Sequence, residues 1–169
     1  MNLSIAAEPS LSPTLRAASV RVSRQLRASP ERIFEAWLDA TELREVLLAG
    51  GMSHCDRPDI DARSGGGFRI VGRGPGGDVE YSGEYLEIDR PQRLVFSLFV
   101  EKYAQWDDRV IVELAPIAGH SLLVLTHELS LPHPLQRSRV RRGWARVLDG
   151  LAALCAEGRL RSAAKPLRR

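Results

Sequence analysis

The chain has 169 residues, of which 44% are hydrophobic and 27% are charged, the composition of one globular domain and not of a long disordered segment. It contains no long apolar run and no basic and apolar leader at its N-terminus, so we expect no transmembrane segment, no signal peptide and a cytoplasmic location. The formal net charge is +3, but the residues from Arg137 onward carry ten Lys or Arg against two acidic residues. The first 136 residues therefore carry a net charge of −5.

The two ends of the chain are expected to lie outside the folded part. Residues 1–13 show no sustained hydrophobic period and contain two prolines, which predicts a flexible leader, and 159–169 predict a basic flexible tail. Residues 14–158 are expected to form a single domain. Cys55 and Cys155 are far apart and belong to no closely spaced ligand set, so buried free thiols are favoured over a disulfide or a metal site.

The first part of the domain predicts a strand followed by two short helices. An alternating apolar run begins at Thr14 and is typical of a half-buried strand, with Arg24 on its apolar face. Ser29, followed by proline, is a helix start signal. Asp39 or Thr41 caps a second helix. A strand, a helix and a further helix therefore open the domain.

Residues 52–126 predict about six short strands. Turn sequences rich in Gly, such as 64–67 and 74–78, separate apolar stretches. Pro58 interrupts the first of these strands and places that residue at an edge or a bulge. Short strands with short connections in unbroken succession predict an antiparallel meander.

The segment 134–158 predicts one long amphipathic helix, because its apolar residues recur with helical spacing. These residues are Val140, Trp144, Val147, Leu148, Leu151, Leu154 and Cys155. Gly143 and Gly150 border this stripe, and each costs about 1 kcal/mol relative to Ala in a helix, which indicates a need for clearance beside a strand or a cavity. One helix covers about seven strands only if the sheet is strongly bent. The predicted fold class is α+β, with a curved antiparallel sheet of about seven strands, two short helices after the first strand and a long C-terminal helix.

Signatures of catalysis and metal binding are weak. The sequence from Gly119 to Ser121 begins like a nucleophile elbow, but Leu123 stands where the motif ends in Gly. His127 and Glu128 lack the second His of a zinc-protease motif, and the four histidines show no ligand spacing. We therefore predict no catalytic residue, no metal and no cofactor, and the sequence favours a non-enzymatic protein while leaving an enzyme open.

Several motifs, in this order, resemble those of a known family. They are Arg24 with Ala28-Ser29-Pro30, the helix from Ile33 to Trp37, Cys55-Asp56 through Gly66, Gly83 to Ile88, Pro91 to Phe96, Leu125-Thr126-His127, and Gly143-Trp144 with Leu148 and Leu151. The chain resembles the START-like or Bet v 1-like superfamily, also called SRPBCC, and within it the group similar to the C-terminal domain of the activator of heat-shock-protein-90 ATPase. The resemblance implies the helix-grip fold, with a cavity between the sheet and the long helix.

Two departures from the family pattern fall near the expected mouth of that cavity. Val46 to Gly50 stand where the family carries tryptophans followed by Gly-Pro, and Leu98 stands where the family often carries Trp. Both remove aromatic bulk, which leaves room for a larger ligand or a more flexible lid.

The candidate ligand site combines apolar residues of the sheet and helices with two polar side chains. The predicted site residues are Trp37, Phe96, Leu98, Leu123, Leu125, Trp144, Val147, Leu148 and Leu151, with Arg24 and His127 as the polar contacts. A structural ion pair with Glu84 or Glu87 is the alternative for Arg24. A hydrogen-bonded core histidine is the alternative for His127.

The sequence leaves four possible functions open. The first is binding of a small hydrophobic ligand, and the second is a cyclase-like or aromatase-like enzyme for a polyketide-like substrate, with His127 as acid or base. The resemblance suggests a third, a chaperone-related protein-interaction module. The basic face of the long helix offers contact with nucleic acid or an anionic membrane, for which a solvated surface is the simpler interpretation and nucleic acid is not expected. Leu122 and Val124 are expected to face away from the helix and suggest a homodimer.

Overall fold

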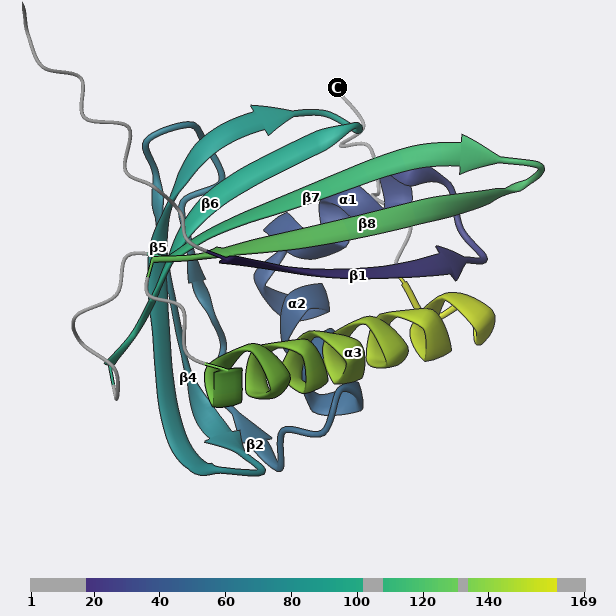
Figure 1. Ribbon diagram of the computed structural model, residues 1–169. Coiled ribbons are helices and arrows are strands. Elements are labelled where there is room, and N and C mark those ends of the chain that lie inside the picture. Colours follow the sequence, from purple (N-terminus) through teal and green to yellow (C-terminus); the bar gives the residue numbers. More distant parts are fainter. Residues whose placement is uncertain (1–17, 102–107, 131–133, 161–169) are drawn as a thin grey trace, which may run out of the picture.

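The computed structural model (Figure 1) describes residues 18–101, 108–130 and 134–160. The predicted leader and most of the predicted basic tail lie outside the described residues. None of the helices in the described part is long and apolar enough to cross a membrane.

The described chain contains a strand, two helices, seven further strands and one long helix. In chain order these are β1 (Ala18–Leu26), α1 (Pro30–Leu38), α2 (Ala40–Ala49), β2 (His54–Cys55), β3 (Asp59–Ile60), β4 (Gly67–Gly74), β5 (Gly77–Asp89), β6 (Arg93–Val100), β7 (Asp108–Ile117), β8 (His120–Leu129) and α3 (Pro134–Ala156).

The strands form one antiparallel sheet in the order β1-β8-β7-β6-β5-β4-β2, with β3 also paired to β4. Figure 1 shows this sheet curling around, with the helices on its concave side and α3 running along β1. The predicted helix-grip fold is therefore confirmed. The sheet has eight strands where about seven were expected, because the strand predicted over 52–60 is two short strands on either side of Pro58.

The two short helices begin where the sequence predicts. The Ser29 hydroxyl accepts a hydrogen bond from the Arg32 N–H at 3.4 Å and starts α1. The Asp39 carboxylate accepts hydrogen bonds from the N–H groups of Thr41 and Glu42 at 2.9 and 2.8 Å. Asp39, and not Thr41, is therefore the cap of α2.

The long helix changes its environment along its length. Leu148, Leu151 and Leu154, in its C-terminal half, are at most 3% exposed. Trp144 and Val147, in the middle of the helix, are only half-buried. A Cβ at Gly150 would lie 2.5 Å from the backbone nitrogen of Gly50, so the missing side chain lets α3 meet the end of α2. This crossing fixes the C-terminal part of α3, and the middle of the helix borders a cavity.

Candidate ligand-binding cavity

A cavity of about 180 Å³ lies between the concave face of the sheet, the end of α2 and the middle of α3. Its wall is almost entirely apolar. The lining residues are Trp37, Leu43, Leu47, Gly50, Met52, Phe68, Ile70, Gly74, Pro75, Tyr81, Tyr85, Leu94, Phe96, Leu98, Gly143, Trp144, Arg146 and Val147. A concave apolar site with a few polar groups is the usual form of a small-molecule binding site.

Aromatic rings from three adjacent strands form the part of the wall on the sheet. The Phe68 ring centroid lies 5.4 Å from that of Tyr85 and 5.5 Å from that of Phe96, the latter edge to face. A Cβ at Gly83 would lie 2.7 Å from the Phe68 ring, so this glycine makes room for the ring. Burial raises the pKa of Tyr85 to about 12, so its phenol stays neutral at physiological pH.

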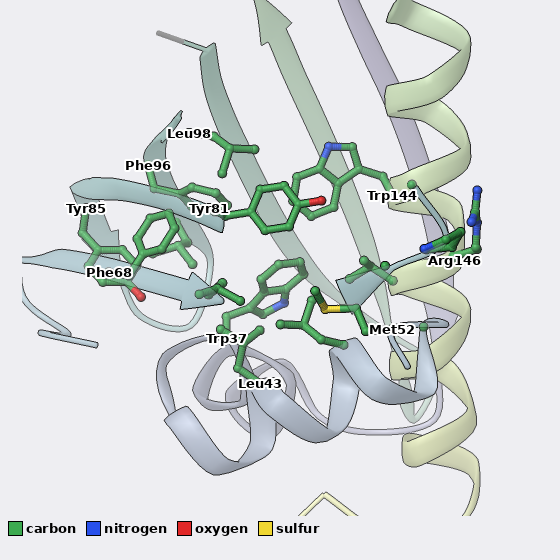
Figure 2. A pocket seen from close by; sticks show the side chains of 18 residues that line it. Trp37, Leu43, Met52, Phe68, Tyr81, Tyr85, Phe96, Leu98, Trp144 and Arg146 are labelled. Carbon is green, nitrogen blue, oxygen red and sulfur yellow. The ribbon is translucent and has the colours of Figure 1, made fainter. Parts of the chain in front are cut away.

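Two tryptophans of the cavity wall pack against each other, with ring centroids 6.2 Å apart and ring planes at 47° (Figure 2). Their indole nitrogens differ. Trp144 Nε1 donates a hydrogen bond to His127 Nδ1 at 2.9 Å. Trp37, which is 7% exposed, has no hydrogen-bond partner for its Nε1 among the described residues. The Trp144 indole is therefore positioned by its hydrogen bond to His127, whereas the Trp37 indole is positioned by packing alone.

His127 is the middle of a buried hydrogen-bond chain. Its Nε2 donates to Asp108 Oδ2 at 2.9 Å while its Nδ1 accepts from Trp144, which assigns the neutral Nε2–H tautomer from the network. The other oxygen of Asp108 accepts from the N–H and hydroxyl of Ser130 at 2.8 and 2.9 Å. Burial acts to raise the pKa of Asp108, but these hydrogen bonds outweigh it and the pKa is lowered. Asp108 is therefore a carboxylate at neutral pH.

A second cavity lies on the other side of Trp144. It shares Tyr81, Leu98 and Trp144 with the first and adds Asp108 and His127. These shared side chains form a partition between the two spaces. Trp144 therefore contributes to the wall of both cavities.

Five of the predicted site residues line the first cavity: Trp37, Phe96, Leu98, Trp144 and Val147.

Four predicted leucines, Leu123, Leu125, Leu148 and Leu151, belong instead to the hydrophobic core and are not among the lining residues. They are at most 1% exposed. Leu148 and Leu151 lie on the part of α3 that packs against α2 and β1, where no space is left. Helical periodicity places a residue on the inner face but does not say whether that face meets a wall or a void.

The two predicted polar contacts lie outside the first cavity. Arg24 Nε donates to Asp149 Oδ1 at 2.8 Å, so its partner is not Glu84 or Glu87, and that expectation was wrong. The pairing arises because β1 lies directly beside α3. His127 faces the second cavity, is 3% exposed, and has both ring nitrogens hydrogen-bonded, as expected for a core histidine.

Other lining residues were not anticipated. Phe68, Ile70, Tyr81 and Tyr85 come from β4 and β5. The alternation of Phe68 and Ile70 was a usable signal for an inward face, whereas the pairing of Phe68 with Gly83 depends on the sheet register. Arg146, which belongs to the basic face of the long helix, is exposed, as a solvated surface requires, and it also lines the cavity.

The described residues hold no group of three or more His, Cys, Asp or Glu placed to bind a metal ion. Both cysteines are buried and free, which confirms the expectation. The Ser121 hydroxyl donates to the Ala28 carbonyl at 2.7 Å and is part of the core. This hydrogen bond ties β8 to the residue before the α1 cap.

Comparison with known proteins agrees with the fold. The model of the activator of Hsp90 ATPase homolog 1-like protein family matches residues 27–156. No curated protein matches the chain.

Among solved structures, protein CV1439 from Chromobacterium violaceum is 26% identical, with a TM-score of 0.70 over 81% of this chain and 96% of that one. Protein Ms6760 from Mycobacterium smegmatis is 18% identical, with a TM-score of 0.69 over 80% and 89%. CalU16 from Micromonospora echinospora is 23% identical, with a TM-score of 0.63 over 83% and 77%. The last two show the shared fold alone. With the family match over most of its length, the chain belongs to the activator of Hsp90 ATPase homolog 1-like family, an SRPBCC-type family.

Proposed function

We propose that this protein binds a small, mainly apolar molecule in the cavity that the sheet, the end of α2 and α3 enclose, with Trp37 and Trp144 in its wall. The observation that carries the proposal is the wall itself: of the 18 lining residues one is charged, and the sheet side is aromatic. An apolar surface of this kind gains free energy when a ligand replaces water against it, at roughly 25 cal/mol for each Å² buried. Membership of the chain in its family supports a ligand-binding type of domain but does not identify a ligand.

An enzyme of the cyclase type is the second candidate, and the state of His127 weighs against it. Such an enzyme needs an acid or base with a free atom toward the substrate. Both nitrogens of His127 are already hydrogen-bonded, to Asp108 and Trp144. The arrangement therefore favours a structural role for His127 and binding as the function of the cavity.

Other expectations stay predictions. Leu122 and Val124 point away from the core and are half-buried, which is compatible with the expected homodimer. The free thiols fit a reducing compartment such as the cytoplasm. A chaperone-related interaction remains an expectation that rests on the family.

The direct test is titration of the protein with straight-chain alcohols while tryptophan fluorescence is followed. Trp37 and Trp144 both line the cavity, so a bound alcohol is expected to change their emission in a saturable way. The variant Val147→Phe adds a ring to the α3 wall, and because packed sites tolerate added volume poorly, we expect its affinity to fall at least about tenfold.

Ala153→Phe is the matched control, since Ala153 is exposed on the same helix and lines neither cavity. It is expected to bind as the wild type does, and circular dichroism checks that both variants are folded. The proposal is contradicted if the wild type gives no saturable response, or if the two variants lose affinity equally.

A further inference from the structure

The cavity wall carries one charged side chain, Arg146, and no acidic one. Arg146 lies on α3 opposite the end of α2: a Cβ at Gly51 would lie 3.8 Å from its Cδ atom. In Figure 2 it is seen at the α3 side of the cavity, with Phe68 and Tyr85 at the far side. Arg146 is exposed as well as lining the cavity, so the cavity has an aromatic end against the sheet and a cationic side chain at its rim on α3.

The Arg146 guanidinium makes no hydrogen bond or ion pair with any of the described residues. Many other arginines of the chain are paired, for example Arg93 with Glu87 and Glu113, and Arg24 with Asp149. A guanidinium carries five N–H donors in a planar fork that matches a carboxylate or phosphate. Arg146 has this capacity unused beside an apolar space.

The charged side chains of α3 before Asp149 are all positive. From Pro134 to Leu148 the sequence contains five arginines and no acidic residue, and the first acid, Asp149, is already bound to Arg24. The resulting field at the mouth attracts anions and opposes cations.

We propose that the ligand is an anionic amphiphile, with its apolar body in the cavity toward Phe68 and Tyr85 and a carboxylate or phosphate at the mouth on the Arg146 guanidinium. This inference rests on the proposed function, since it assigns the ligand class of the same cavity. The hydrophobic wall accounts for affinity, and Arg146 accounts for the orientation of the ligand and the choice of headgroup.

The test compares four probes with the same apolar tail by isothermal titration calorimetry: decanoate, decyl phosphate, decanol and decyltrimethylammonium. Partly exposed charge-assisted contacts are worth little to moderate free energy, so we expect the better anion to bind roughly three- to tenfold more tightly than decanol. Decyltrimethylammonium is expected to bind most weakly. The ranking of decanoate against decyl phosphate identifies the headgroup.

Arg146→Gln is expected to remove the preference for the anion over decanol while leaving decanol binding unchanged. Arg142→Gln is the matched control, because Arg142 is exposed on the same helix and lines neither cavity, and it is expected to keep the preference. Arg146→Lys keeps the charge but not the planar fork of N–H donors, and is expected to keep part of the preference for the anion.

The outcomes separate the inference from the proposed function. Equal binding of decanol and both anions overturns the inference and leaves the function standing. Equal loss of preference in Arg146→Gln and Arg142→Gln also overturns it, because the field of the helix and not Arg146 then selects the anion. Absence of binding by all four probes overturns the proposed function itself.

Discussion

Two parts of α3 carry the same hydrophobic period but have different surroundings. In the C-terminal half, Leu148 and Leu151 are buried against the sheet and α2. In the middle of the helix, Trp144 and Val147 face a cavity and remain half-buried. The same stripe is thus a core surface at one end and a cavity wall at the other.

The two glycines of α3 mark this division. A Cβ at Gly150 would meet the backbone of Gly50 at 2.5 Å and of Ala49 and Val46 at 2.8 Å, whereas a Cβ at Gly143 would meet nothing within 4 Å. One glycine permits contact between helices and the other borders open space. The C-terminal part of α3 is therefore fixed by its contact with α2, and the part around Trp144 borders the cavity.

The largest contrast is expected between neighbouring residues. Leu148→Ala removes a fully buried side chain and is expected to lower the free energy of unfolding by about 2–5 kcal/mol. Val147→Ala is expected to cost less than about 1 kcal/mol, because its side chain is already half-exposed at the cavity. Urea unfolding measures both. Equal losses would show that Val147 is packed as tightly as Leu148 and does not border a cavity.

The glycines give the next contrast, with opposite signs. Gly150→Ala forces a methyl group into backbone atoms of α2 and is expected to lower the free energy of unfolding by about 1–3 kcal/mol. Gly143→Ala meets open space and is expected to raise it by about 0.5–1 kcal/mol through reduced entropy of the unfolded chain. A destabilised Gly143→Ala variant would contradict the open environment assigned to that position.

The sequence predicted most of the fold, because local signals there agree with tertiary structure. Ser29 caps α1, Asp39 caps α2, and β8 alternates with Leu123 and Leu125 inward as expected. The two glycines of α3 were expected to give clearance beside a strand or a cavity. Gly143 borders open space, but Gly150 meets the end of helix α2 and not a strand.

The cavity was only partly predictable. Trp37, Phe96 and Leu98 were found because they face inward near the helix, but Leu123 faces inward too and meets core atoms. Whether an inward residue borders a void depends on how closely α3 approaches each strand, which no local pattern encodes. Asp108 could not be assigned a partner from sequence, because its contact with His127 spans two neighbouring strands.

The hydrogen-bond chain from Asp108 through His127 to Trp144 is expected to make the stability of the domain sensitive to acid. The lowered pKa of Asp108 means that its contribution to stability is present above the ordinary carboxyl value of about 4 and is lost as the pH falls through the lowered pKa. Asp108→Asn is expected to cost about 1.5 kcal/mol at neutral pH, as for hydrogen bonds to a charged group. Thermal unfolding of both proteins from neutral to acid pH should show this difference shrinking below about pH 4; a constant difference would contradict the assignment.

The smallest contrast concerns the two indoles. Trp144→Phe leaves His127 Nδ1 without its donor, and is expected to cost about 1 kcal/mol beyond the loss of ring area. This excess is measurable as a coupling energy, by comparing Trp144→Phe in the wild type and in His127→Phe, where no acceptor remains. For Trp37, whose nitrogen has no partner among the described residues, the same cycle with His127→Phe is expected to give no coupling. Equal coupling of Trp37 and Trp144 to His127 would contradict a stabilising role for the hydrogen bond of Trp144. The part of α3 around Trp144 would then be positioned by packing alone.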